Sequence, residues 1–242
     1  MSNYLVGHLK EKHMLQTILL IFSFIIVYTI AIKGNIAFKK NADKFYIISL
    51  LLCLFTILVM FKFISLPHHA WYMLPISLLS GGFMGVAIWT TVMLARHIPN
   101  TKLKAKLMAV RSELSIMGFF LTLPQPLVYT TNGWLKVSSQ PTSFIYPMIT
   151  SIYLILLLVL GITSFPQIRK KLSAIRWKKI QKWAYSFYYL LFIQLICIAG
   201  MRTFFYYSMG NTTETFATLI RTSIYLFVFV LWHILKRESK KG

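Results

Sequence analysis

Acidic residues are scarce in this sequence: its 242 residues include 5 Asp and Glu against 26 Lys and Arg. Charged residues of both signs make up 13%, roughly half the share that soluble domains use to cover their surface. Hydrophobic residues make up 57% and come in long runs. A soluble globular domain is therefore excluded, and the composition indicates a single domain of membrane helices.

Cysteine is also scarce, since Cys53 and Cys197 are the two in the chain and each lies inside an apolar run. Two thiols so far apart do not make a disulfide framework or a cysteine-based metal site. We expect both to be buried packing residues. The polar stretch 1–13 lacks the cleavage pattern of a signal peptide, so the first apolar run is expected to be a retained helix.

Long apolar runs dominate the rest of the chain. A membrane-spanning helix needs about 20 mostly apolar residues. Seven segments meet that requirement: 14–32, 45–64, 72–95, 107–131, 146–164, 183–201 and 215–235. The fourth contains Pro124-Gln125-Pro126, so it is expected to kink or unwind there. The predicted fold class is all-α, a polytopic membrane bundle of about seven transmembrane helices.

The basic residues lie in short clusters between the apolar runs. With seven spans, 19 of the 26 Lys and Arg fall on one side and 5 on the other, while Arg111 and Arg221 lie within helices. By the positive-inside rule, the basic loops and the C-terminus are cytoplasmic and the N-terminus is outside. Such clusters meet anionic lipid headgroups, so the net charge of +21 does not indicate a nucleic-acid partner. We expect a multi-pass protein of the cell membrane, with the lipid bilayer as a partner.

The segment 161–194 carries a recognisable pattern, GITSFPQIRKKLSAIRWKKIQKWAYSFYYLLFIQ. Its key places are a Thr-Ser pair at a helix end, a basic loop with Trp, and a Tyr in the next helix: Thr163, Ser164, Arg169, Leu172, Trp177, Lys178 and Tyr185. A weaker pattern in the fourth span consists of Arg111, Leu114, Phe119 and Tyr129. Together they resemble the ferric reductase-like transmembrane domain family, most closely its small, MsrQ-like bacterial branch. The resemblance covers roughly 45–235, so 1–44 is predicted to be an added helix with a basic loop and 236–242 a basic cytoplasmic tail.

The resemblance implies three haem-ligating positions, and this sequence has Gln125, Gln181 and Gln194 there. Histidine holds haem iron through a ring nitrogen, whereas a glutamine amide has no basic nitrogen and is a poor axial ligand. Bis-histidine haem b is therefore not expected. If haem is bound after all, His97 and His233, near the cytoplasmic ends of the third and seventh spans, are the substitute ligands to test first.

Depth along the helices places these residues at two levels. Arg111 and Gln125 are separated by roughly 21 Å of helix rise, and Gln181 and Gln194 by roughly 20 Å. Because both spans start at the cytoplasm, Gln125 and Gln194 share an outer level and Arg111 and Gln181 an inner one. Their convergence on a common interior is implied by the resemblance alone, since thirteen residues leave Gln181 and Gln194 roughly 140° apart around the helix.

These polar residues admit two interpretations. The glutamines can satisfy one another across helices after a loss of haem, or they can line a cavity for another redox ligand, suspected to be a flavin or quinone. The arginines can snorkel toward headgroups, or those near the outer end can bind an anion such as a flavin phosphate. The candidate cofactor-binding residues are Gln125, Gln181, Gln194, Arg111, Arg202 and Arg221. No catalytic residue and no metal site is predicted.

We interpret the chain as a membrane component of transmembrane electron transfer, a possible oxidoreductase subunit. Its partners would be a cytoplasmic electron donor protein and an extracytoplasmic redox partner. Only about seven residues follow the last span, so nicotinamide-derived electrons are expected to come through a separate protein. The alternatives are a non-catalytic subunit that anchors or assembles a redox complex, and a haem protein with substitute ligands. A permease fits less well, because the spans lack paired acidic residues and a clear inverted repeat.

Overall fold

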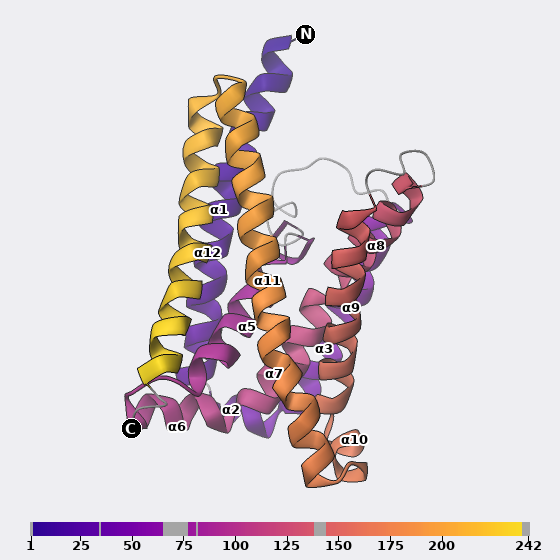
Figure 1. Cartoon of the computed structure of the whole chain (residues 1–242), viewed down its shortest axis with the longest axis vertical. Helices are drawn as coiled ribbons and strands as arrows, with labels where there is room; N and C mark the ends of the chain where they lie inside the picture. Colours follow the sequence, from indigo (N-terminus) through magenta and orange to yellow (C-terminus); the bar gives the residue numbers. More distant parts are fainter. Residues whose placement is uncertain (1, 34, 65–76, 81, 138–143, 239–242) are drawn as a thin grey trace.

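The computed structural model describes residues 2–33, 35–64, 77–80, 82–137 and 144–238, and each regular element in these ranges is a helix (Figure 1). The helices are α1 (Ser2–Ile32), α2 (Asn35–Lys40), α3 (Ala42–Met60), α5 (Phe83–Ala95), α6 (Thr101–Ala109), α7 (Arg111–Thr122), α8 (Pro124–Val137), α9 (Ile145–Ser164), α10 (Pro166–Lys171), α11 (Ala174–Ser208) and α12 (Thr212–Glu238). No strand occurs in the described ranges, and the predicted all-α fold class is confirmed for them.

Five helices are long and apolar enough to cross a membrane: α1 over Leu15–Ile32, then α3, α9, α11 and α12. A sixth candidate consists of α6 followed by the stretch Arg111–Val137, which contains α7 and α8. The helix α6 meets that stretch at a bend of 57°. The helix α5 is apolar but has 13 residues, and the predicted third span begins in a segment outside the described residues. The described helices thus give five or six candidate spans, and a count of seven stays a prediction.

The candidate spans leave much of their apolar surface uncovered. The apolar window of α3 is 17% buried inside the protein, and that of α9 is 39% buried. Large side chains such as Ile47, Leu51 and Phe227 are more than half exposed. So much exposed apolar surface suits the hydrocarbon of a bilayer, and it is unusual for a protein in water. By length and composition, these helices are of the kind that spans a membrane.

The fourth apolar segment bends mainly before its prolines. The helix α7 ends at Thr122 and α8 begins at Pro124, so the break there is confined to Leu123. Proline is tolerated at that place because the first turn of a helix has N–H groups without a helical acceptor. The bend of 57° lies at Val110, between α6 and α7.

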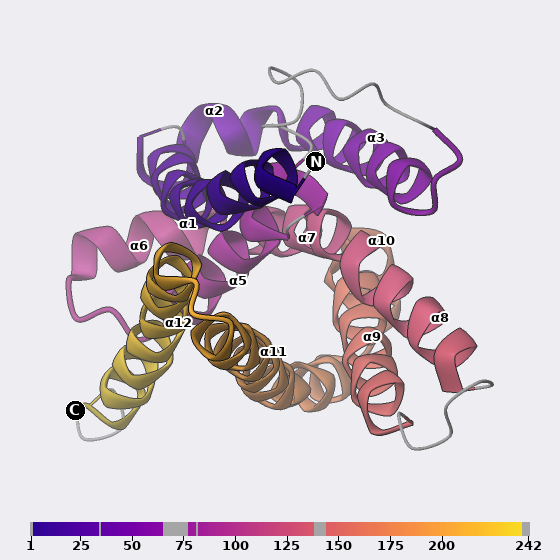
Figure 2. The same cartoon turned by 90° about the horizontal axis from the view of Figure 1, so that it is seen from above.

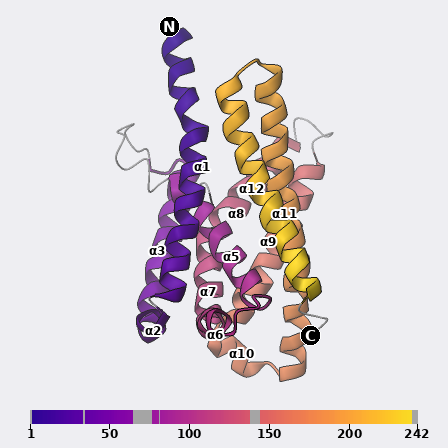
Figure 3. The same ribbon diagram turned by 90° about the vertical axis from the view of Figure 1, so that its left-hand side faces the viewer.

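The helices follow one another around the bundle. Packing runs from α1 to α12, α11, α9 and α8, while α5 contacts both α1 and α7. Seen from above, α11, α9, α8, α7 and α5 surround the middle of the bundle (Figure 2). From the side, α12 runs beside α11 along the bundle (Figure 3). The short helices α2, α6 and α10 lie at the same end of the bundle as the C-terminus (Figure 1).

The two cysteines have different surroundings. Cys53 is buried, as predicted, whereas Cys197 is exposed on α11, and the expectation that it packs inside was wrong. The reason is that an apolar run is uniformly hydrophobic around the helix, so sequence does not distinguish the face toward lipid from the face toward other helices.

Candidate functional site

A cavity of about 480 Å³ holds four of the predicted site residues. Gln125, Gln194, Arg202 and Arg221 all line it, from α8, α11 and α12. Its further polar lining residues are Gln16, Ser77, Ser80, Thr122, Tyr129, Tyr153 and Tyr225. We call it the glutamine cavity. Gln125 and Gln194, which the rise of their helices predicted to share one level of the membrane, thus line the same cavity.

Gln125 is held at the wall of the glutamine cavity because its amide lies close to the backbone at Ser80 and Gly82. Its Nε2 donates a hydrogen bond to the carbonyl oxygen of Ser80 at 3.2 Å. Gly82 precedes α5 with φ of 69°, and a Cβ there would collide with the amide of Gln125. Glycine is therefore favoured at position 82 by its backbone conformation, and a Cβ there would also displace the amide of Gln125.

Two polar groups of the glutamine cavity are available to a ligand. The half-buried Gln194 forms no hydrogen bond with another described residue. The Tyr153 hydroxyl is buried and likewise has no partner among the described residues. A buried hydroxyl without a partner is costly, so such groups mark places where a water or ligand completes the hydrogen bonds.

Arg221 is fixed from α1. Its Nη1 donates to Oε1 of Gln16 at 3.0 Å, and its Nη2 donates to Oγ1 of Thr17 at 3.5 Å. Glu214, two turns earlier on α12, is also buried and attracts the guanidinium electrostatically. Because Arg221 is 4% exposed, it does not snorkel to the headgroups. Arg202 is half-buried and lines the same cavity from α11.

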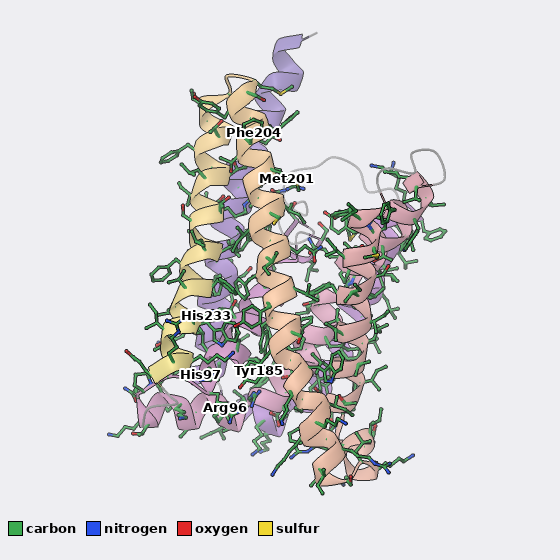
Figure 4. The ribbon with its side chains drawn as sticks, viewed as in Figure 1. Arg96, His97, Tyr185, Met201, Phe204 and His233 are labelled. Atoms are coloured by element: carbon green, nitrogen blue, oxygen red, sulfur yellow. The ribbon has the colours of Figure 1, made fainter. Side chains whose placement is uncertain are left out.

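The remaining two predicted residues, Arg111 and Gln181, line a second cavity of about 380 Å³. The other lining residues are Met93, Arg96, His97, Trp177, Lys178, Lys182, Ala184, Tyr185 and Tyr188. We call it the basic cavity. Arg96, His97 and Tyr185 lie near the lower end of the bundle in Figure 4, whereas Met201 and Phe204 lie toward the upper end of α11. The six predicted residues are thus divided between two cavities at different heights.

Positive charge dominates the basic cavity. The Arg111 guanidinium lies close to the Tyr188 hydroxyl and interacts with it electrostatically, and Arg96 Nη1 lies 3.5 Å from the Tyr185 hydroxyl. His97 is 8% exposed, and burial lowers its pKa below the ordinary 6.5. The positive charges that lower it further are those of Arg96, Lys236, Lys104 and Arg111. His97 is therefore neutral at neutral pH.

A row of buried aromatic rings joins the two cavities. Tyr153, which lines the glutamine cavity, stacks on Phe187 with ring centroids 5.1 Å apart. Phe187 meets Tyr188, which lines the basic cavity, at 5.8 Å. Trp89 contacts Phe187 at 4.9 Å and Tyr188 at 6.3 Å. We call Tyr153, Phe187, Tyr188 and Trp89 the aromatic bridge.

The aromatic bridge is also tied to the glutamine cavity by a hydrogen bond. Trp89 Nε1 donates to Oγ1 of Thr122 at 3.0 Å, and Thr122 lines that cavity. A side chain at Gly85 would collide with the Thr122 hydroxyl, so the close approach of α5 and α7 depends on this glycine. Small residues permit such close helix packing in membranes.

The candidate substitute haem ligands do not meet in one cavity. His97 lines the basic cavity, whereas the His233 ring nitrogen Nε2 lies 2.9 Å from the Tyr189 hydroxyl and His233 lines a separate pocket. His68 and His69 lie outside the described residues. Within the described ranges, no group of three His, Cys, Asp or Glu side chains is arranged to hold a metal ion.

Sequence reasoning missed Tyr153, Gln16 and the aromatic bridge. Tyr153 stands in the middle of the apolar segment 146–164, and a polar group so deep in a span is a signal that could have marked it. Gln16 gave no such signal, because it lies near the start of the first span. Its role comes from the packing of α1 against α12.

Comparisons with known proteins give one relative and no assignment. No family model matches the chain, and no solved structure matches it. The chain is 29% identical over 180 residues to an uncharacterised protein of Treponema pallidum (strain Nichols). The match covers 72% of this chain and 50% of that protein, so the chain spans about half the length of the relative it matches. The resemblance to ferric reductase-like proteins stays a prediction.

Proposed function

We propose that this chain carries electrons across a membrane between two ligand sites, one in the glutamine cavity and one at the basic cavity. The observation that supports this most strongly is the aromatic bridge, which runs from the lining of one cavity to the lining of the other. The rings form a continuous packed path between the linings of the two cavities, so an electron that passes from one site to the other would tunnel through contacting side chains.

The proposed topology has seven spans, with the N-terminus outside and the C-terminus in the cytoplasm. The start of α1 and the end of α12 lie at opposite ends of the bundle, which supports an odd number of crossings (Figure 1). The helices α2, α6 and α10, which carry many of the basic residues, lie at the C-terminal end. That end is cytoplasmic by the positive-inside rule, so the glutamine cavity would lie in the extracytoplasmic half.

A flat redox ring, flavin or quinone, fits the lining of the glutamine cavity. Gln194 offers both an acceptor and donors, the Tyr153 hydroxyl lacks a partner among the described residues, and Arg202 supplies a fixed positive charge. Carbonyl oxygens and ring N–H groups match these side chains in a dry pocket. Among the described lining residues there is no histidine, so bis-histidine haem does not fit there. Such a ring supplies the electron chemistry, and the protein binds and orients it.

The partners follow from charge. The cytoplasmic end presents the basic residues of α6, α10 and the start of α11, which would attract an electron donor protein with an acidic face. An extracytoplasmic redox partner would take electrons from the glutamine cavity.

The cofactor content of the purified protein tests this proposal. We expect flavin or quinone in near-stoichiometric amount in extracts of the wild type. The double variant Gln125→Leu, Gln194→Leu is expected to lose it, while Gln167→Leu, exposed on α10 and outside both cavities, keeps it. A protein that holds neither compound, and takes up neither added FMN nor added menadione, would overturn the proposal. A haem absorption band in place of both would overturn the assigned ligand.

A further inference from the structure

The basic cavity has an excess of positive charge that the described part of the protein does not balance. Four cations line it: Arg96 at the end of α5, Arg111 at the start of α7, and Lys178 and Lys182 on α11. None of the described Asp or Glu residues is in the lining, and none forms an ion pair with these four. The described carboxylate nearest in sequence, Glu113, accepts a hydrogen bond from Ser112 at 2.8 Å.

Neutral hydrogen-bond donors complete the lining. The Trp177 Nε1–H is buried and has no acceptor among the described residues. The half-buried Gln181 likewise forms no hydrogen bond with another described residue. Arg169 stacks over the Trp177 ring at 4.4 Å, which fixes the indole at the rim of the cavity. A buried N–H without an acceptor is costly, so it marks a place where a ligand oxygen can accept a hydrogen bond.

The lowered pKa of His97 reflects the same excess of positive charge around the basic cavity. Burial and the surrounding cations together keep it neutral, so it adds no further positive charge to the cavity. The charge of Lys236 is also near, since its Nζ lies 4.5 Å from the centroid of the Tyr185 ring. A cluster of this kind creates a positive potential that attracts anions.

We propose that the basic cavity is a binding site for a phosphate group, with Arg96, Arg111, Lys178 and Lys182 as its cations. Phosphate offers several oxygens to several donors at once, and guanidinium groups bind it in a bidentate manner. Gln181 and the Trp177 N–H bind the oxygens that the cations leave. The phosphate belongs either to a soluble molecule that enters from the cytoplasm or to the headgroup of an anionic lipid. This inference does not rest on the proposed electron transfer.

Two binding measurements on the full-length protein test the site. In the first, inorganic pyrophosphate is titrated by calorimetry into protein held in phosphatidylcholine nanodiscs. In the second, native mass spectrometry counts the lipid retained from nanodiscs that contain phosphatidylglycerol. The test variant is Arg111→Gln with Lys178→Gln. The matched control is Lys170→Gln with Lys171→Gln, which removes the same charge from α10, where both side chains are exposed and neither lines the cavity.

For a soluble ligand, we expect pyrophosphate to bind the wild type and the control, and the test variant to bind it roughly tenfold more weakly. For a lipid ligand, we expect phosphatidylglycerol to be retained by the wild type and the control and lost by the test variant. If the test variant does not fold, Gln181→Leu serves instead, since it removes a donor and no charge. Equal behaviour of the test and control variants in both measurements overturns the site. Cofactor content in the glutamine cavity is a separate readout, so either proposal can fail alone.

Discussion

Tyr153 of α9 stacks on Phe187 of α11, with ring centroids 5.1 Å apart and an angle of 13° between the ring planes. The contact joins two helices that pack against each other, and it joins the lining of the glutamine cavity to the buried core. Stacking of aromatic rings adds stability beyond the burial of their area. Here it also begins the path of rings that ends at Tyr188 in the basic cavity.

Replacing Phe187 by Leu tests whether the ring itself matters. Leucine keeps the site apolar, so we expect the variant to fold, whereas electron transfer across the bilayer of proteoliposomes falls roughly tenfold. Phe204→Leu on the same helix is the matched control, because Phe204 is 73% exposed and lies outside the bridge. Equal rates for the two variants would show that the Phe187 ring is a packing element only.

Gly82→Ala is expected to destabilise the protein by about 1–3 kcal/mol, because position 82 has φ of 69° and a Cβ there meets Gln125. The same change should weaken binding in the glutamine cavity by displacing the amide. Thermal unfolding in detergent measures the first effect, and cofactor retention the second. Gly200→Ala is the control: a Cβ there has nothing within 4 Å, so its unfolding temperature should not fall.

Gln16→Leu is expected to cost about 1–3 kcal/mol of stability, because it removes the oxygen that accepts a hydrogen bond from the buried Arg221 at 3.0 Å. The measurement is again thermal unfolding, compared with Gln167→Leu, whose side chain is exposed on α10. A cost equal to that of the control would mean that Arg221 is held by its other partners alone.

His97 makes stability depend on pH in a defined direction. Its pKa is lowered in the folded protein by burial and by Arg96, Lys236, Lys104 and Arg111. Well above pH 6.5 the side chain is neutral in both states and contributes nothing. As the pH falls below 6.5, the unfolded chain takes up a proton that the folded protein resists, so stability is lost.

Unfolding temperatures measured between about pH 7.5 and about pH 5.5 check this, with His97→Gln as the comparison. We expect the wild type to lose more stability than the variant over that range. Saturating pyrophosphate should reduce the loss if the phosphate site is real, because a bound anion favours the protonated imidazole. A wild type that becomes more stable on acidification relative to His97→Gln would contradict the assignment.

The sequence predicted the depth of the site residues better than their surroundings. The rise of the helix was enough to put Gln125 with Gln194 and Arg111 with Gln181, and the structure has each pair in one cavity. The partners of Arg221 were not predictable, since Gln16 and Thr17 are about 200 residues away and meet it through the packing of α1. The exposure of Cys197 and the bend at Val110 also depend on tertiary packing, which periodicity does not encode.

The most direct test is whether the wild-type protein carries electrons through a sealed bilayer. Ferricyanide is trapped inside proteoliposomes, reduced FMN is added outside, and the loss of ferricyanide colour is followed with time. Neither compound crosses a lipid bilayer readily, because both are charged. Our account predicts that ferricyanide is reduced much faster than in protein-free liposomes and that Phe187→Leu slows the reaction. Rates equal to those of protein-free liposomes, with the protein folded and loaded with flavin or quinone, would contradict it.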